Sequence, residues 1–140
     1  MNTGKRTEAV LDTNVLVSAA LSEGKPYKIL SLAEDGEIIS VTSPAIIAEL
    51  RDVLTRDRLP FTDDQVEELM TKIHSISRVI HPEVELNVIK DDPDDDKILE
   101  CAVARDADCI VSGDSHLLDL EQHAQFQIYS PNEFLNNFNH

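Results

Sequence analysis

The segment Ala-Val-Leu-Asp-Thr-Asn-Val-Leu, residues 9–16, decides the fold class of this chain. Its first three residues are apolar and predict a short β-strand, and an apolar helical pattern then begins at about Asn14 and continues to Leu21. Asp12 therefore follows directly on a strand and stands just before a helix. A strand that passes directly into a helix is the unit from which α/β folds are built.

The rest of the chain repeats this alternation of short strand-like and longer helix-like segments. Strands are expected at residues 38–41, 78–80, 109–111 and 126–129, and helices at 26–34 and 44–55, from Thr62, around 98–103 and from Pro131. Such alternation predicts an α/β fold with a parallel sheet covered by helices on both faces. In parallel sheets, functional residues gather at the carboxyl ends of the strands.

Length and composition predict one ordinary globular domain spanning residues 1–140. The chain has 140 residues, of which 41% are hydrophobic and 28% charged, and this usage excludes a disordered or collagen-like protein. The two cysteines, Cys101 and Cys109, are interpreted as small buried hydrophobic residues in a reducing, cytoplasmic compartment. The longest nearly apolar stretch, residues 15–21, is too short to span a bilayer, so no membrane association is expected.

The charge balance is strongly acidic. There are 27 acidic side chains and 12 basic ones, which gives a formal net charge of −15. A protein that binds phosphate backbones by charge alone needs the opposite balance. The composition therefore predicts weak non-specific binding to nucleic acid.

Asp12 and Asp114 each follow a predicted strand closely. Asp12 comes directly after residues 9–11, and Asp114 comes shortly after residues 109–111, in the sequence Ser-Gly-Asp. Both carboxylates are thus expected at the edge where a parallel sheet opens its crevice. For either one alone a helix N-cap is at least as good an explanation, since Asp is a favoured N-cap residue. Two such residues at equivalent strand ends favour a site.

Glu49 flanks the apolar stripe of the predicted 44–55 helix and does not lie on its solvated side. Its neighbours at helical spacing are Ala45, Asp52 and Val53, so no basic residue is placed to pair with it. The ordinary explanation by a helical ion pair is therefore missing. A partly exposed glutamate that only adds solubility is an equally good alternative.

The run Asp-Asp-Pro-Asp-Asp-Asp, residues 91–96, is the most unusual segment of the sequence. Acidic residues before a helix are stabilised by its dipole, but five aspartates in six residues repel one another. Extending the stripe of Ile98, Leu99, Ala102 and Val103 backwards places Asp95 on the inward face and Asp96 at its edge. Asp95 is the expected site residue, and Asp96 or Asp92 stay open as alternatives.

Carboxylates that converge without nearby cations raise one another's pKa, and a hard divalent cation removes this conflict. Ligand sets made only of oxygen favour Mg²⁺ or Mn²⁺ over zinc. The five histidines show no paired spacing that would suit zinc. The expected cofactor is therefore Mg²⁺ or Mn²⁺, as one or two ions.

These residues together resemble a known family. The opening Val-Leu-Asp-Thr-Asn-Val-Leu, residues 10–16, resembles the start of PIN-domain proteins, which are metal-dependent ribonucleases. Glu49, Asp95 and Asp114 match the remaining acidic positions of that family, and the resemblance covers nearly the whole chain. It implies a three-layer α/β/α fold with a five-stranded parallel sheet. The Asp-Pro-Asp-Asp-Asp stretch at residues 92–96, followed by residues 107–114, resembles the branch that contains the toxins of toxin–antitoxin pairs.

The resemblance also implies an activity, which is hydrolysis of single-stranded RNA. Asp12, Glu49, Asp95 and Asp114 would hold the metal, which lowers the pKa of water and stabilises charge on the phosphate. Asn14 would orient Asp12 or a water, although a hydrogen bond at the helix start explains it equally well, and Ser112 would support the site by hydrogen bonding. An antitoxin partner and a homodimer are further expectations. The basic residues that could grip the RNA backbone are Lys25, Lys28, Arg51, Arg56 and Arg58.

Two other functions stay open. A catalytically idle PIN-like module could bind an antitoxin or another partner. Such a module is expected to lack one of the four acidic residues, but this sequence has all four. An aspartate-nucleophile phosphatase also has a carboxylate after its first strand. It normally carries a second Asp two residues further on as general acid, and here that position is Asn14.

Overall fold

A sheet of five parallel strands forms the centre of the protein. The computed structural model describes residues 6–56, 59–82, 96–113 and 127–138, and all structural statements concern these ranges. The strand order is β3-β2-β1-β4-β5, with every neighbouring pair parallel. The strands are β1 (Thr7–Leu11), β2 (Ile38–Thr42), β3 (Ser77–Val79), β4 (Cys109–Val111) and β5 (Gln127–Tyr129).

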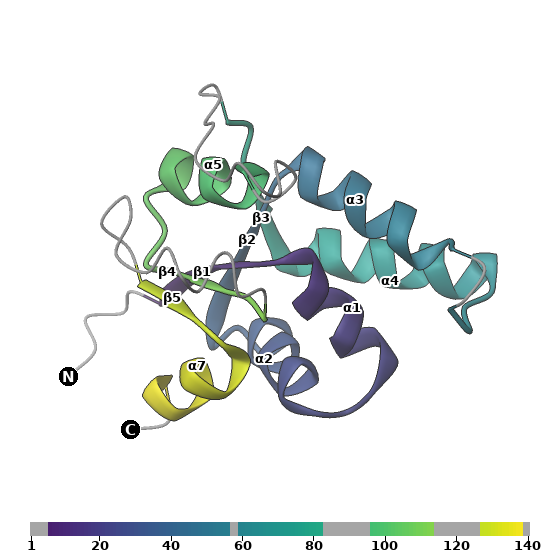
Figure 1. Ribbon diagram of the computed structural model, residues 1–140, viewed down its shortest axis with the longest axis horizontal. Coiled ribbons are helices and arrows are strands. Elements are labelled where there is room, and N and C mark those ends of the chain that lie inside the picture. The colour runs from purple at the N-terminus through teal and green to yellow at the C-terminus, as the bar shows by residue number, and fades with distance from the viewer. Residues whose placement is uncertain (1–5, 57–58, 83–95, 114–126, 139–140) are drawn as a thin grey trace.

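Helices cover both faces of this sheet. The described helices are α1 (Thr13–Leu21), α2 (Lys25–Glu34), α3 (Pro44–Leu54), α4 (Asp63–Ile76), α5 (Asp96–Arg105) and α7 (Pro131–Phe138). On one face α5 packs against β1, β2 and β4, while α2 and α7 lie on the other face against β2 and β5 (Figure 1). This three-layer α/β/α arrangement confirms the fold class predicted from the sequence. None of the described helices is long and apolar enough to cross a membrane.

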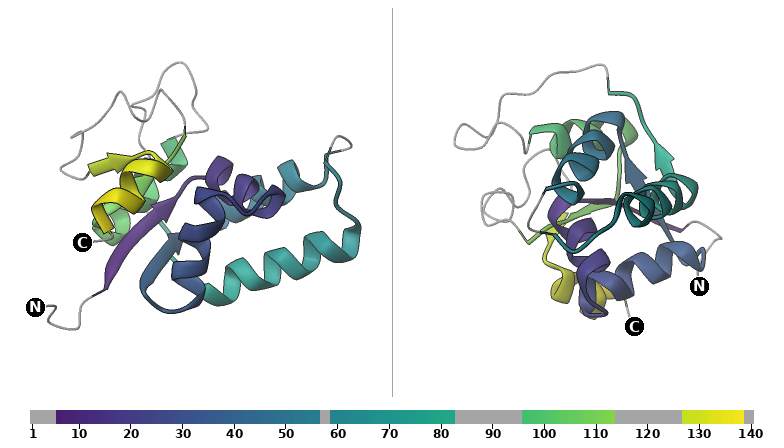
Figure 2. Two further views of the ribbon diagram at one scale, coloured as in Figure 1. Left: turned by 90° about the horizontal axis from the view of Figure 1, so that it is seen from below. Right: turned by 90° about the vertical axis from the view of Figure 1, so that its right-hand side faces the viewer.

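The helices α3 and α4 form a hairpin that projects beyond the sheet on the side where β1 ends (Figures 1 and 2). The side of α3 that faces the core carries Ile46, Leu50 and Leu54, which are at most 1% exposed. Ile47 and Val53, which the apolar pattern also assigned to this stripe, are only partly buried. The helix therefore has a narrow buried stripe, and its flanks remain available for other contacts.

Side-chain caps fix where several helices begin. Ser43 accepts a hydrogen bond of 3.3 Å from a backbone N–H in the first turn of α3. Thr62 and Gln65 form both hydrogen bonds of a capping box at α4. Ser130 and Glu133 exchange the same two bonds at the start of α7. These bonds satisfy backbone N–H groups that have no partner within the helix.

The order of the strands determines where a crevice opens. The chain adds β2 and then β3 on one side of β1, and later adds β4 and β5 on its other side. In the register of the sheet, Val10 of β1 lies opposite Val41 of β2 and Ile110 of β4. The strand order reverses between β1 and β4, and open α/β sheets bind ligands outside the carboxyl ends of the strands at such a reversal.

The helix α5 runs antiparallel to β1, because its last residue lies beside the start of that strand. Arg105 Nε donates a hydrogen bond of 2.6 Å to Glu8 Oε1, and Arg105 Nη2 donates one of 3.1 Å to Glu8 Oε2. The hydrogen bond to Glu8 raises the pKa of Arg105 above its usual value. This ion pair lies at the edge where the strands begin, so the first residues of α5 lie toward the opposite edge, where the strands end.

Candidate metal centre

Asp12 lies at the carboxyl end of the central strand β1 and is only 3% exposed. It occupies the N-cap position of α1, but its side chain makes no capping hydrogen bond. Instead its Oδ2 accepts a hydrogen bond of 2.6 Å from Ser112 Oγ, and its backbone N–H donates one of 3.0 Å to the carbonyl of Val111. The N-cap explanation therefore does not account for this carboxylate, which is held by the residue that follows β4.

Ser112 and Gly113 connect the end of β4 to this carboxylate and to α1. Ser112 is fully buried, and its backbone N–H donates a hydrogen bond of 2.8 Å to the carbonyl of Tyr129 in β5. The backbone N–H of Gly113 donates to Asn14 Oδ1 at 3.3 Å. In the structure Asn14 thus fastens the segment after β4 to α1. An amide has no acidic proton, so Asn14 cannot be the general acid that a phosphatase would require at this position.

Glu49 is brought to the same edge by α3. Thr13 Oγ1, from the residue after Asp12, donates a hydrogen bond of 2.6 Å to Glu49 Oε1. Lys97 Nζ, near the start of α5, lies 3.3 Å from Glu49 Oε2. The expectation that no basic residue pairs with Glu49 is therefore wrong. That expectation rested on neighbours within the same helix. Lys97 instead belongs to α5 and lies 48 residues further along the chain than Glu49.

The donor atoms at this edge suit a hard divalent cation. Asp12 and Glu49 provide carboxylate oxygens, and Thr13 and Ser112 hold one oxygen of each. Thr42 Oγ1, buried at the end of β2, has no hydrogen-bond partner within the described part of the chain. These candidate ligand atoms are all oxygens, which is the ligand type that Mg²⁺ and Mn²⁺ favour.

Sulfur and nitrogen ligands lie elsewhere in the described residues. Burial raises the pKa of the Cys101 thiol to about 12. Burial, with a smaller contribution from the charge of Asp108, raises the pKa of Cys109 to about 12 as well. Both thiols are protonated near neutral pH and are poor metal ligands. His74 and His81 line a groove on another face of α3.

Several of the predicted site residues lie outside the described residues. Asp95, Asp114 and Arg58 belong to this group, as does Asp92, one of the alternatives to Asp95. Asp96, the other alternative, is the first residue of α5. Within the described ranges no cluster of three or more His, Cys, Asp or Glu side chains occurs. Asp12 and Glu49 lie in the described part of the chain, and Thr13, the residue after Asp12, hydrogen-bonds to Glu49.

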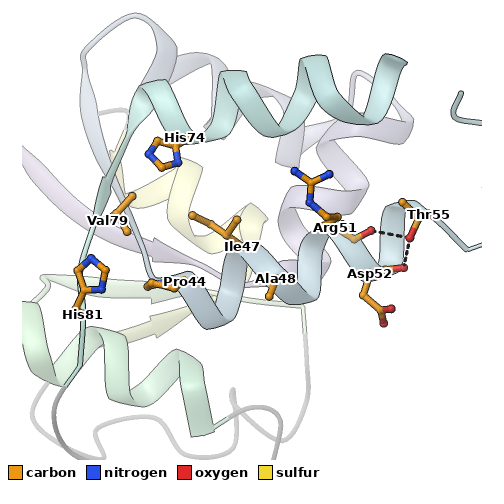
Figure 3. Close-up of a pocket in the computed structure, with 9 residues that line it drawn as sticks. All are labelled: Pro44, Ile47, Ala48, Arg51, Asp52, Thr55, His74, Val79 and His81. Atoms are coloured by element: carbon orange, nitrogen blue, oxygen red, sulfur yellow. Dashed lines mark hydrogen bonds between the residues drawn. The ribbon is translucent and has the colours of Figure 1, made fainter. Parts of the chain in front are cut away.

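The groove between α3 and α4, drawn in Figure 3, is lined by neither Asp12 nor Glu49. Its volume is about 750 Å³, and its lining includes Ile47, Arg51, His74 and Val79. Apolar side chains make up much of this lining, and its one carboxylate, Asp52, pairs with a basic residue one helical turn further on. The groove therefore does not resemble a cation site.

The basic residues predicted to bind the RNA backbone differ in their hydrogen-bond and ion-pair partners. Lys25 Nζ donates a hydrogen bond of 2.6 Å to Asn132 Oδ1 in α7. Arg51 forms an ion pair with Glu67 of α4, which raises the pKa of Arg51 and lowers that of Glu67 through their hydrogen bond. Arg56 pairs with Asp52 at 3.4 Å, and Lys28 is exposed on α2.

Sequence reasoning missed Thr13 and Lys97 as parts of this site. Thr13 stands between two residues of the predicted site, Asp12 and Asn14. Lys97 follows the aspartate run directly, and that position was the available signal. Neither contact could be deduced from spacing, because each one joins different helices.

Comparison with known proteins agrees with this fold. The family described as PIN domain matches residues 8–116 of the chain. An uncharacterized protein of Methanocaldococcus jannaschii is 29% identical over 145 aligned positions, covering 95% of this chain and 92% of that protein.

Among solved structures, VapBC2 from Rickettsia felis, bound to a DNA fragment from their promoter, has a similar fold. The TM-score is 0.63 with 16% identity, covering 89% of this chain and 98% of that chain. PIN domains are generally nucleases and generally use divalent metals. The match over residues 8–116 shows that this chain belongs to the PIN-domain family.

Proposed function

We propose that this chain is an endoribonuclease that hydrolyses single-stranded RNA in the presence of Mg²⁺ or Mn²⁺. Asp12, Glu49, Asp95 and Asp114 would hold the cation, within one domain that spans residues 1–140. Asp12 and Glu49 are supported by their described positions. Asp95 is supported by its place two residues before Lys97, and Asp114 by its place directly after Gly113.

The observation that carries this proposal is the surroundings of Asp12. A buried carboxylate at the carboxyl end of a central strand is costly unless hydrogen bonds or a cation compensate it. Asp12 does not use its carboxylate to cap α1, although it occupies the N-cap position. The chain instead holds that carboxylate with Ser112, and the next residue, Thr13, holds a second carboxylate, that of Glu49. This arrangement is expected where two carboxylates serve one cation.

The residues of the chain would act by binding and orienting. When bound, a divalent cation supplies a nucleophile near neutral pH and stabilises charge that develops on the phosphate. Ser112 would keep Asp12 in one orientation, and Thr13 would do the same for Glu49, as hydrogen-bonding partners of metal ligands commonly do. Asn14 would keep the segment after β4 close to α1, and Asp114 follows in that segment.

Binding of RNA would depend on few basic side chains. Lys25, Lys28, Arg51, Arg56 and Arg58 are the candidates. Arg51 and Arg56 are paired with acidic residues, so they would have to exchange these partners for phosphate. Lys28 is the candidate best placed for phosphate, since it is exposed and forms no ion pair within the described ranges. With a net charge of −15, we expect weak binding in the absence of metal.

We also propose that the chain is the toxin of a toxin–antitoxin pair and acts in the cytoplasm as a homodimer. The similarity in fold to VapBC2 supports the first part, and the free, buried thiols of Cys101 and Cys109 suit a reducing compartment. Co-expression with the product of the neighbouring gene and sedimentation of the purified protein test the partner and the dimer respectively.

The activity is tested with end-labelled single-stranded RNA, incubated with Mn²⁺, with Mg²⁺ and with excess EDTA. Single-stranded DNA and duplex RNA of the same sequence serve as matched controls. The proposal predicts internal cleavage of the single-stranded RNA that stops in EDTA and returns when Mn²⁺ is restored. Cleavage that continues in EDTA after dialysis against the chelator would contradict it.

A binding module without activity is the second candidate, and the α3–α4 groove is the observation that favours it. The groove offers about 750 Å³, and its lining includes the apolar side chains of Pro44, Ile47, Ala48 and Val79, as a surface that receives part of a protein partner would. If no RNA is cleaved under any metal condition while a partner protein binds with high affinity, this second function replaces the first.

A further inference from the structure

We propose that Lys97 competes with the divalent cation for Glu49 and so sets the metal concentration at which the site fills. This inference rests on the proposed function, because it requires that Glu49 takes part in holding the cation. Lys97 acts through Glu49 and is therefore a positioning residue.

The contacts of Glu49 are the observation from which this proposal is argued. Both of its carboxylate oxygens have partners, since Oε1 accepts from Thr13 Oγ1 at 2.6 Å and Oε2 lies 3.3 Å from Lys97 Nζ. The Thr13 hydroxyl is neutral, so it can orient the carboxylate while a cation binds. The Lys97 ammonium carries a full charge, and a dication near Oε2 would face that charge at close range.

The partial burial of this pair makes the effect large. The side chains of Lys97 and Glu49 are 17% and 28% exposed. A pair in this setting is less screened by solvent and salt than a surface pair. Removing one positive charge a few ångströms from a cation site should therefore raise the affinity for that cation on the order of tenfold.

The chain contains a second Lys–Glu pair that serves as a control. Lys72 Nζ lies 3.2 Å from Glu34 Oε2, almost the same separation as in the Lys97–Glu49 pair. These side chains are 38% and 49% exposed, and they join α4 to α2. Lys72 and Glu34 form the same kind of ion pair as Lys97 and Glu49. Neither of them is a candidate for the metal centre, so removing the charge of Lys72 should not change cation binding.

The test measures Mn²⁺ binding to the metal-stripped protein by isothermal titration calorimetry. Lys97→Met removes the charge and keeps most of the side-chain volume, Lys97→Arg keeps the charge, and Lys72→Met removes the control pair. We expect the dissociation constant of Lys97→Met to fall about tenfold, and those of Lys97→Arg and Lys72→Met to stay within about twofold of the wild-type value.

Thermal unfolding in EDTA and in saturating Mn²⁺ gives a second readout that does not depend on activity. Without metal, Lys97→Met should unfold at a lower temperature than the wild type, because Glu49 loses its cationic partner. Its increase in Tm on adding Mn²⁺ should exceed the wild-type increase. If Lys97→Met does not fold, Lys97→Gln takes its place in both measurements.

The outcomes separate this inference from the proposed function. Unchanged or weaker Mn²⁺ binding by the neutral Lys97 variant, with normal binding and RNA cleavage by the wild type, would overturn the role of Lys97 alone. Wild-type protein that neither binds Mn²⁺ nor cleaves RNA would overturn the proposed function, and the inference with it. Tighter binding by Lys72→Met as well would overturn the inference, since the effect would then reflect only overall charge.

Discussion

Ser112 and Asp12 are 100 positions apart in the sequence, and a hydrogen bond of 2.6 Å joins the hydroxyl of one to the carboxylate of the other. Both residues are almost completely buried, and each directly follows a strand, β4 and β1 respectively. Because these strands are neighbours, the sheet itself determines that the two side chains meet. The predictions below follow from this relationship and from the contacts around it.

Replacing Ser112 with Ala should weaken the metal centre. The variant removes a buried donor to Asp12 Oδ2, and loss of such a partner typically costs about 10- to 100-fold in metal affinity or activity. The free energy of unfolding should fall by about 1–3 kcal/mol. Metal-dependent cleavage and urea unfolding measure the two effects.

Ser40→Ala is the matched control for this variant. Ser40 is also buried on the sheet, and its hydroxyl accepts a hydrogen bond of 3.0 Å from Ser77. Its replacement should lower stability and leave the Mn²⁺ dependence unchanged. If both variants change the Mn²⁺ dependence equally, Ser112 has only a structural role.

Replacing Thr13 with Val should affect the site through Glu49. Val has nearly the same shape as Thr but cannot donate to Glu49 Oε1, so the carboxylate loses the bond that orients it. We expect kcat/KM for RNA to fall about tenfold or more. Thr13→Ser keeps the hydroxyl and should retain most of the activity. Normal activity of Thr13→Val, or an equal loss in Thr13→Ser, would contradict a specific role of the hydroxyl.

The fold could be predicted well because its signals are local. Apolar runs before Asp12 and Ser112 indicated strands, and the helices expected from residue 44 and from Thr62 begin within one residue of those positions, at side-chain caps. The boundaries differ slightly, since α1 begins at Thr13 and not at Asn14. A helix boundary depends on backbone geometry as well as on the apolar pattern, so such a shift is expected.

The site could be predicted only in part, because its contacts link distant segments. The position of Asp12 at a strand end followed from the order of strand and helix. The Lys97–Glu49 pair and the Thr13–Glu49 bond did not, since both depend on how α3 packs beside α1 and α5. The pairing of Arg51 with Glu67 likewise depends on the α3–α4 hairpin. Spacing along one helix contains no information about these contacts.

Replacing Thr62 with Ala should lower stability without changing activity. Thr62 and Gln65 exchange hydrogen bonds of 3.2 and 2.9 Å at the start of α4, far in the sequence from the acidic candidates. Loss of such a cap costs about 1 kcal/mol. Chemical denaturation measures the loss, and Thr71→Ala, at an exposed position in the same helix, should change stability by less. A reduced rate of RNA cleavage would show that α4 contributes to the site.

The two cysteines should react slowly in the folded protein and weaken the fold at high pH. Burial raises both pKa values to about 12, whereas an unfolded thiol titrates near 8.5. The folded state therefore holds these protons more tightly. Its stability is fully present below about pH 8.5 and declines as pH rises toward 12.

Reaction with a chromophoric disulfide reagent at pH 8 checks the first part of this prediction, and urea unfolding between pH 7.5 and 10.5 checks the second. The double variant Cys101→Ala and Cys109→Ala should lose less stability over the same pH range. Rapid labelling of the native protein at pH 8 would show that the thiols are accessible and ionised.

The central claim is that Asp12 holds a cation that RNA cleavage requires. The most direct test compares the Mn²⁺-dependent cleavage rates of the wild type and Asp12→Asn, a change that keeps the size of the side chain and removes its charge. Circular dichroism and thermal unfolding must first show that the variant is folded. We predict that the folded variant loses at least about 100-fold in rate and no longer binds Mn²⁺ at concentrations that saturate the wild type. A folded Asp12→Asn variant that cleaves RNA at the wild-type rate would contradict the claim.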